Sequence, residues 1–85
     1  MFPRIHRNGT SAKELAEQYE NAAHEITNAI RALGNAGPNA RNYYPIGDHA
    51  FNAAQKEHST HMEALRSAHA YIEALWEHCA DSVAA

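Results

Sequence analysis

A helix-breaking segment in the middle of the chain limits the possible folds more than any other sequence feature. Residues 34–47 contain two prolines, three glycines and three asparagines, and this composition disfavours regular structure. Stretches with helical periodicity lie on both sides of the segment. We therefore predict an all-α fold in which two antiparallel helices are joined by a long ordered loop.

The first helix is predicted to span 11–33. Ser11 and Glu14 have the spacing of a capping box, in which the Ser11 hydroxyl accepts a hydrogen bond from the Glu14 amide. Gly34 follows the last periodic position and predicts the end of the helix. Apolar side chains recur at steps of three and four through this stretch, as on an amphipathic helix; they are Leu15, Tyr19, Ala22, Ile26, Ile30 and Leu33.

The second helix is predicted to span 48–82, with Asp48 as its N-cap. Its stripe is heptad-like, because five residues lie seven positions apart; they are Phe51, His58, Leu65, Ile72 and Cys79. If the helices fold back directly across the loop, Leu33 lies near Phe51 and Ser11 lies near Ile72. The last turns of the second helix then overhang, and we expect both the segment Met1–Ile5 and a second chain to contribute to covering them.

The chain is too short to bury a large core. Its 85 residues form a single domain at 1–85, and alanine supplies much of the 45% apolar content. A domain of this size buries only about 60 to 65% of the surface that its unfolded chain exposes. We therefore expect copies to associate into a helical-bundle oligomer.

Composition also limits where the protein works and what it binds. One cysteine excludes an internal disulfide framework and favours a reducing compartment. The N-terminal arm, 1–10, lacks the apolar run of a secretory signal, and no stretch is apolar enough to span a membrane. A net charge of −3 gives no general reason to bind duplex nucleic acid. These features predict a cytoplasmic protein without a membrane partner.

The histidines and the cysteine are the first residues to consider for chemistry. His58 and His61 lie at i and i+3, and the predicted register places His24 at a similar height, so a metal site is one interpretation. Solvated polar histidines are the alternative that we favour. Cys79 lies on the apolar stripe and is expected to be buried and inert. No catalytic motif is present, so we predict neither an enzyme nor a cofactor.

The loop carries the side chains that most resemble a ligand site. Tyrosines offer stacking faces, asparagines offer amide groups for base edges, and arginine suits phosphate. The amides at the start of the second helix favour an anion, although Asp48 opposes one. A structural alternative remains open, in which the tyrosines only close the end of the bundle. The predicted binding residues are Arg31, Asn39, Arg41, Asn42, Tyr43, Tyr44 and His49.

The N-terminal arm is a second candidate for binding. It carries a short basic stretch before the first predicted cap, which suits a phosphate or an acidic partner surface; a solvated terminus is the alternative. The residues concerned are Arg4, His6, Arg7 and Asn8.

Several segments together resemble small helical-hairpin proteins encoded by tailed phages and prophages. These are Asn-Gly-Thr-Ser at 8–11, Ala-Gly-Pro-Asn-Ala-Arg-Asn-Tyr-Tyr-Pro at 36–45, the Gly-Asp and Ala-Phe pairs that follow, and Glu-His-Cys near the end. The resemblance covers most of the chain and carries over no catalytic residue. It implies a small oligomeric phage protein, a group that includes anti-defence factors, some of which sequester nucleotide immune signals between subunits.

Two functional hypotheses follow. In the first, the protein is a non-enzymatic phage anti-defence protein that sequesters a nucleotide-like immune signal in an inter-subunit pocket built from the 34–48 loop. In the second, it is an interaction module whose helical face inhibits or regulates a host or phage protein. Both predict a cytoplasmic protein, in the cytoplasm of the host cell if the chain is phage-encoded.

Overall fold

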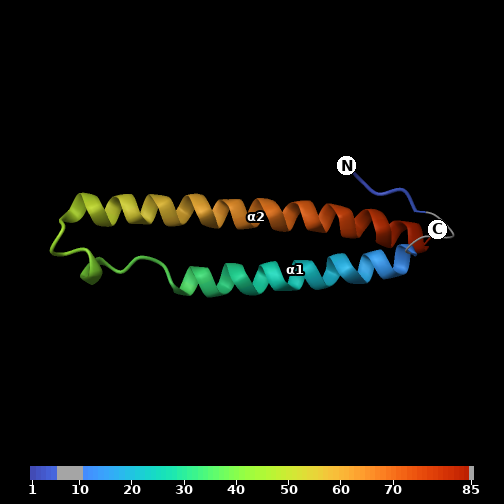
Figure 1. Ribbon diagram of the computed structural model, residues 1–85, viewed down its shortest axis with the longest axis horizontal. Helices are drawn as coiled ribbons and strands as arrows, with labels where there is room; N and C mark the ends of the chain where they lie inside the picture. The colour runs from blue at the N-terminus through green and yellow to red at the C-terminus, as the bar shows by residue number, and fades with distance from the viewer. Residues whose placement is uncertain (6–10, 85) are drawn as a thin grey trace.

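The protein folds into two long helices that lie side by side in opposite directions (Figure 1). The computed structural model describes residues 1–5 and 11–84. Helix α1 spans Ala12–Asn35, a short 3₁₀ helix η1 spans Ala40–Asn42, and helix α2 spans Asp48–Ala84. No β-strand occurs within these residues, so the all-α prediction is confirmed. The hairpin measures 61 × 20 × 18 Å.

A side-chain cap starts α1. Ser11 has an extended backbone, and its hydroxyl accepts a hydrogen bond of 3.1 Å from the backbone amide of Glu14. This is the predicted cap, and it satisfies one of the amides that have no carbonyl partner within the first turn. The Glu14 carboxylate also lies in that turn, where its negative charge interacts favourably with the positive end of the helix dipole.

The end of α1 differs from the prediction. The helix continues through Gly34 to Asn35, and Ala36 is the C-cap, with its amide donating to the carbonyls of Ala32 and Leu33 at 3.1 Å each. These bonds satisfy the carbonyls of Ala32 and Leu33 without a left-handed residue at Gly34. Gly47 is the one described glycine with a positive φ, 114°.

Backbone hydrogen bonds fold the loop between the helices into a defined turn. The Asn39 side chain accepts from the Arg41 amide at 3.0 Å and caps η1, and the Tyr43 amide donates to the Ala40 carbonyl. The amides of Ile46 and Gly47 both donate to the Tyr43 carbonyl at 3.0 Å. The loop is therefore ordered by its own backbone.

Helix α2 begins directly after Gly47. The amide of Ala50 donates to the Gly47 carbonyl at 3.2 Å. Asp48, which the sequence suggested as the N-cap, is instead the first helical residue and contributes its charge to the first turn. The left-handed backbone of Gly47 provides the sharp entry into the helix, because that conformation costs glycine little.

The register of the two helices differs from the predicted one. Thr27 bonds to His69, and a methyl group placed on Gly34 would lie 3.7 Å from Met62. The predicted pairs, Leu33 with Phe51 and Ser11 with Ile72, are therefore wrong by roughly three helical turns. The physical reason is that the loop continues beyond the end of α1 alongside the first turns of α2 (Figure 1), so the overhang lies at the start of α2 and not at its end.

The core is a single seam in which α1 covers the later turns of α2. Leu75 is 3% exposed and Cys79 is fully buried, and with Met62 they form the buried apolar set of the described residues. No residue of α1 is fully buried. Large apolar side chains remain exposed on the surface; they are Met1, Phe2, Tyr44, Ile46, Tyr71, Trp76 and Val83.

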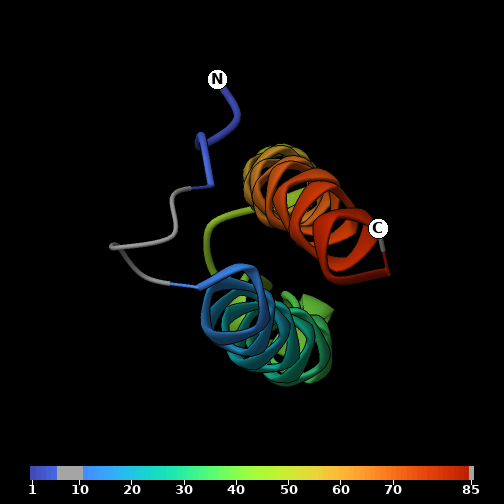
Figure 2. The same ribbon diagram turned by 90° about the vertical axis from the view of Figure 1, so that its right-hand side faces the viewer.

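The first residues of the chain lie against the end of α2 (Figure 2). The ring of Phe2 stacks on the His78 imidazole with centroids 4.9 Å apart, and Nε2 of His78 lies 3.1 Å from the Pro3 carbonyl oxygen, to which it donates. The arm therefore folds back toward the last turns of α2, where it contacts His78. Within the described residues, no helix is both long and apolar enough to cross a membrane.

Candidate functional site

Three of the predicted binding residues are exposed together in the loop. Arg41 and Asn42 belong to η1, and Tyr44 follows two residues later with 71% of its surface exposed. The hydrogen bonds of the turn hold their backbone in place. A guanidinium, an amide and a phenol ring are thus offered to solvent from one short rigid segment.

Two other predicted residues hold the loop in shape. Tyr43 is half-buried, and its ring centroid lies 6.1 Å from that of Phe51 with a tilt of 45°. The oxygen of the Asn39 side chain is already occupied by the Arg41 amide. Tyr43 therefore has a packing role, because it lies against the start of α2. Tyr44 is exposed and does not share that role.

The two remaining predicted residues lie on the helices. Arg31 is exposed on α1 and His49 is exposed in the first turn of α2. Within residues 1–5 and 11–84, no hydrogen bond or ion pair joins either side chain to Arg41 or Tyr44. Asp48 stands beside His49 in the first turn and places a negative charge there.

The observed register separates the histidines that were considered for a metal site. His24 lies in a groove with His69, whereas His58 lies beside Gly37 and His61 lines a different surface depression on α2. Across the described residues, no group of three or more histidine, cysteine, aspartate or glutamate side chains is arranged to hold a metal ion. Placing His24 beside His58 and His61 was wrong, because it depended on the predicted register.

The basic stretch of the N-terminal arm is described only in part. Arg4 is exposed. His6, Arg7 and Asn8 lie outside the described residues.

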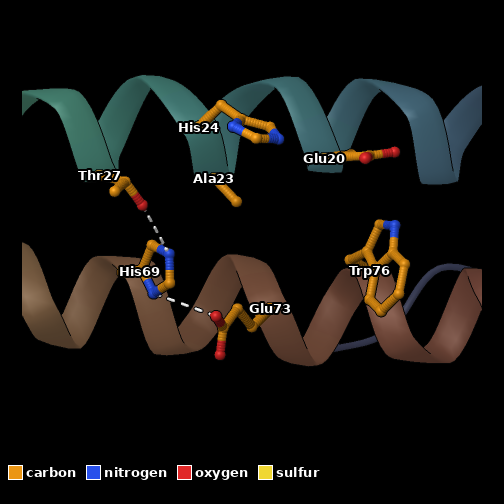
Figure 3. A pocket seen from close by; sticks show the side chains of 7 residues that line it. All are labelled: Glu20, Ala23, His24, Thr27, His69, Glu73 and Trp76. Atoms are coloured by element: carbon orange, nitrogen blue, oxygen red, sulfur yellow. Dashed lines mark hydrogen bonds and ion pairs between the residues drawn. The ribbon is translucent and has the colours of Figure 1, made fainter.

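A polar groove between the helices was not anticipated from the sequence. It has a volume of about 230 Å³, and Figure 3 shows its lining side chains on the two helices. Its lining combines carboxylates, imidazoles, a hydroxyl and an indole; the residues are Glu20, Ala23, His24 and Thr27 from α1, and His69, Glu73 and Trp76 from α2.

A short polar chain crosses the groove. The Thr27 hydroxyl and Nε2 of His69 form a hydrogen bond of 3.1 Å, and Nδ1 of the same ring lies 3.4 Å from a carboxylate oxygen of Glu73. With a proton on Nδ1 facing the carboxylate, the neutral ring accepts at Nε2 from the Thr27 hydroxyl. Thr27 of α1 thus contacts the imidazole at Nε2, and Glu73 of α2 lies beside Nδ1 (Figure 3).

Sequence reasoning missed most of this groove. From the sequence, His24 was considered as one histidine of a metal site, and Thr27 was not considered. The available signal was the i, i+4 spacing of His69 and Glu73 on α2, which predicts that they are neighbours. This spacing does not predict which residues of α1 lie opposite the pair.

Cys79 is the other residue considered for chemistry, and it is fully buried as predicted. Its neighbour in sequence, His78, contacts Phe2 and Pro3.

No protein-family model, curated protein or solved structure matches this chain. The functional argument therefore depends on the geometry of its own residues.

Proposed function

We propose that the protein is a non-enzymatic binding protein that captures a nucleotide-like ligand with the 34–48 loop. The observation that carries the proposal is the exposure of Tyr44, 71%, beside the exposed Arg41 and Asn42 on a hydrogen-bonded turn. An aromatic residue this exposed gains little from the fold itself, and a base stacked on its ring would cover it.

Each exposed loop residue suits a different part of such a ligand. The guanidinium of Arg41 can pair with a phosphate through two parallel hydrogen bonds. The Asn42 amide can both donate to and accept from a base edge. Tyr43 and Asn39, which were predicted to touch the ligand, act in this proposal through the shape of the loop.

Association of several copies is part of the proposal. Its support is the small core, in which Leu75, Cys79 and Met62 are the buried apolar side chains of the described chain, while Tyr71 and Val83 are 60% and 52% exposed. Burial of apolar surface contributes about 25 cal/mol per Å², so a second copy that covers these side chains is stabilising. The proposal also holds that loops of neighbouring copies share the pocket.

The resemblance at 8–11 and 36–45 supports the biological role in this proposal. In a phage-encoded protein, capture of a nucleotide immune signal would act as anti-defence by sequestration. The alternative function is docking of a host or phage protein on the helical face, and the exposed ring of Tyr71 favours it.

Calorimetric titration with a defined set of nucleotides tests the loop. AMP, ADP-ribose and cyclic di-AMP are the probes, and at least one should bind to the wild-type chain. Tyr44→Leu and Arg41→Ala should each weaken that binding at least tenfold, whereas Tyr44→Phe keeps the stacking face and should retain it. Arg66→Ala, which removes an exposed arginine of α2, is the matched control.

Two results would overturn the assignment. The first is absence of binding to all three probes at millimolar concentration. The second is unchanged affinity in Arg41→Ala and Tyr44→Leu while circular dichroism shows an intact helical fold. Sedimentation velocity on the same samples tests association separately, and a 9.4 kDa monomer at micromolar concentration would contradict that part.

A further inference from the structure

We propose that the groove between α1 and α2 binds a small alkylammonium ion, held by the carboxylates of Glu20 and Glu73 and by the ring of Trp76. The site is separate from the loop. It is built from both helices, so it exists only when the hairpin is folded in the observed register (Figure 3).

The charge of the lining favours a cation. Glu20 comes from α1 and Glu73 comes from α2, and neither lysine nor arginine is among the groove residues. Within the described chain, the one polar contact of these carboxylates is that of Glu73 with Nδ1 of His69, at 3.4 Å. Two carboxylates that share a concave surface attract a cation more strongly than two isolated surface charges do.

The indole of Trp76 supplies the second element of recognition. Its ring points from α2 toward α1, on the side of the groove where Glu20 lies (Figure 3), and 37% of the residue is exposed. Ala23 also lines the groove and contributes only a methyl group, which leaves space above the ring. An ammonium group within about 6 Å of an indole centroid is attracted to the face of the ring.

The polar chain across the groove fixes the position of one carboxylate. The His69 ring is held by the Thr27 hydroxyl at Nε2, so its Nδ1 stays directed at Glu73. His69 is therefore a positioning residue, which orders the Glu73 side chain before a ligand arrives. Such preorganisation reduces the entropy lost on binding.

The size of the groove sets the class of ligand. Its volume of about 230 Å³ corresponds to several water-sized groups at roughly 30 Å³ each. A quaternary ammonium or a short aliphatic diamine fits this space. The two carboxylates on opposite helices favour the diamine, whose two charges can each meet one of them.

Intrinsic fluorescence tests this proposal directly, because Trp76 is the single tryptophan of the chain. The full chain is titrated with putrescine and, separately, with tetramethylammonium, against sodium chloride at equal ionic strength. We expect a saturable change of Trp76 emission with half-saturation in the millimolar range, tighter for putrescine. Free N-acetyltryptophanamide in the same titrations corrects for non-specific quenching.

Charge-matched variants locate the cation. The double variant Glu20→Gln with Glu73→Gln should weaken putrescine binding at least tenfold. Glu25→Gln with Glu77→Gln removes the same charge from exposed positions that do not line the groove, and it should bind as the wild type does. His69→Asn keeps a donor on the side of Nδ1 and should bind more tightly than His69→Leu.

Several outcomes would overturn the proposal. One is the absence of a saturable change in wild-type emission, together with an unmoved Trp76 indole N–H signal in NMR spectra, up to 100 mM putrescine. Another is equal affinity in the two double-glutamine variants. Arg41→Ala and Tyr44→Leu should leave the amine titration unchanged, so failure of the loop function is distinguishable from failure of this site.

Discussion

Thr27 of α1 and His69 of α2 form a hydrogen bond of 3.1 Å although they are 42 positions apart in the chain. The bond joins side chains at the edge of the seam, where the helices are otherwise held by apolar contact. Because a slip of one helix by a turn would separate the two groups, the bond favours one register over its neighbours. The same bond directs the His69 ring toward Glu73 and so shapes the groove.

Loss of this bond should destabilise the hairpin slightly. Thr27→Val keeps the shape of the side chain and removes the hydroxyl, and the expected cost is about 0.5 to 1 kcal/mol because the bond is solvent-exposed. Thr60→Val is the matched control, since the Thr60 hydroxyl bonds only to the Lys56 carbonyl within α2. Urea unfolding followed by circular dichroism at fixed protein concentration measures both, and equal midpoints would contradict the role given to Thr27.

Two glycine substitutions should have opposite effects on stability. Gly47 has φ of 114°, so Gly47→Ala should destabilise the fold by about 1 to 3 kcal/mol. Gly34 lies inside α1, and an added methyl group would meet Met62 at an ordinary distance of 3.7 Å. Gly34→Ala should therefore stabilise the protein by up to about 1 kcal/mol. Thermal unfolding compares the two, and a stabilising Gly47→Ala would contradict the left-handed backbone at Gly47.

The thiol of Cys79 should be protected in the folded protein. Because the residue is fully buried, a thiol reagent such as dithionitrobenzoate should react slowly in buffer and rapidly in 6 M guanidinium chloride, which provides the control. Cys79→Ser should cost about 1 to 3 kcal/mol, since it buries a hydroxyl in an apolar seam. Rapid reaction of the native thiol would argue against the packing of α1 over the last turns of α2.

The contact of the N-terminal arm should be visible in the NMR signals of His78. Phe2→Ala removes the ring that stacks on this imidazole at 4.9 Å, so the ring-proton shifts of His78 should change. The stability loss should be small, about 0.5 kcal/mol, because Phe2 is half exposed. Ile46→Ala, a change at an exposed apolar residue of the loop, should leave the His78 signals in place. Unmoved His78 signals in Phe2→Ala would rule out the stacked arm.

Much of the local structure could be predicted because its causes lie within a few residues. The Ser11 cap depends on an amide three positions away, and the apolar spacing of each helix depends on a period of 3.6 residues. The burial of Cys79 followed from its place on the α2 stripe. The exposed ring of Tyr44 lies in the segment that the prolines and glycines had marked as a loop.

Only the tertiary structure decided how the two helices are paired. The stripe of α2 is longer than that of α1 and repeats every three or four residues, so several registers bury similar apolar surface and local pattern cannot rank them. The choice depends on the whole set of contacts, including the packing of Tyr43 on Phe51 and the bond of Thr27 to His69. The groove with Glu20, Glu73 and Trp76 exists only in that register, so no local sequence motif predicts it.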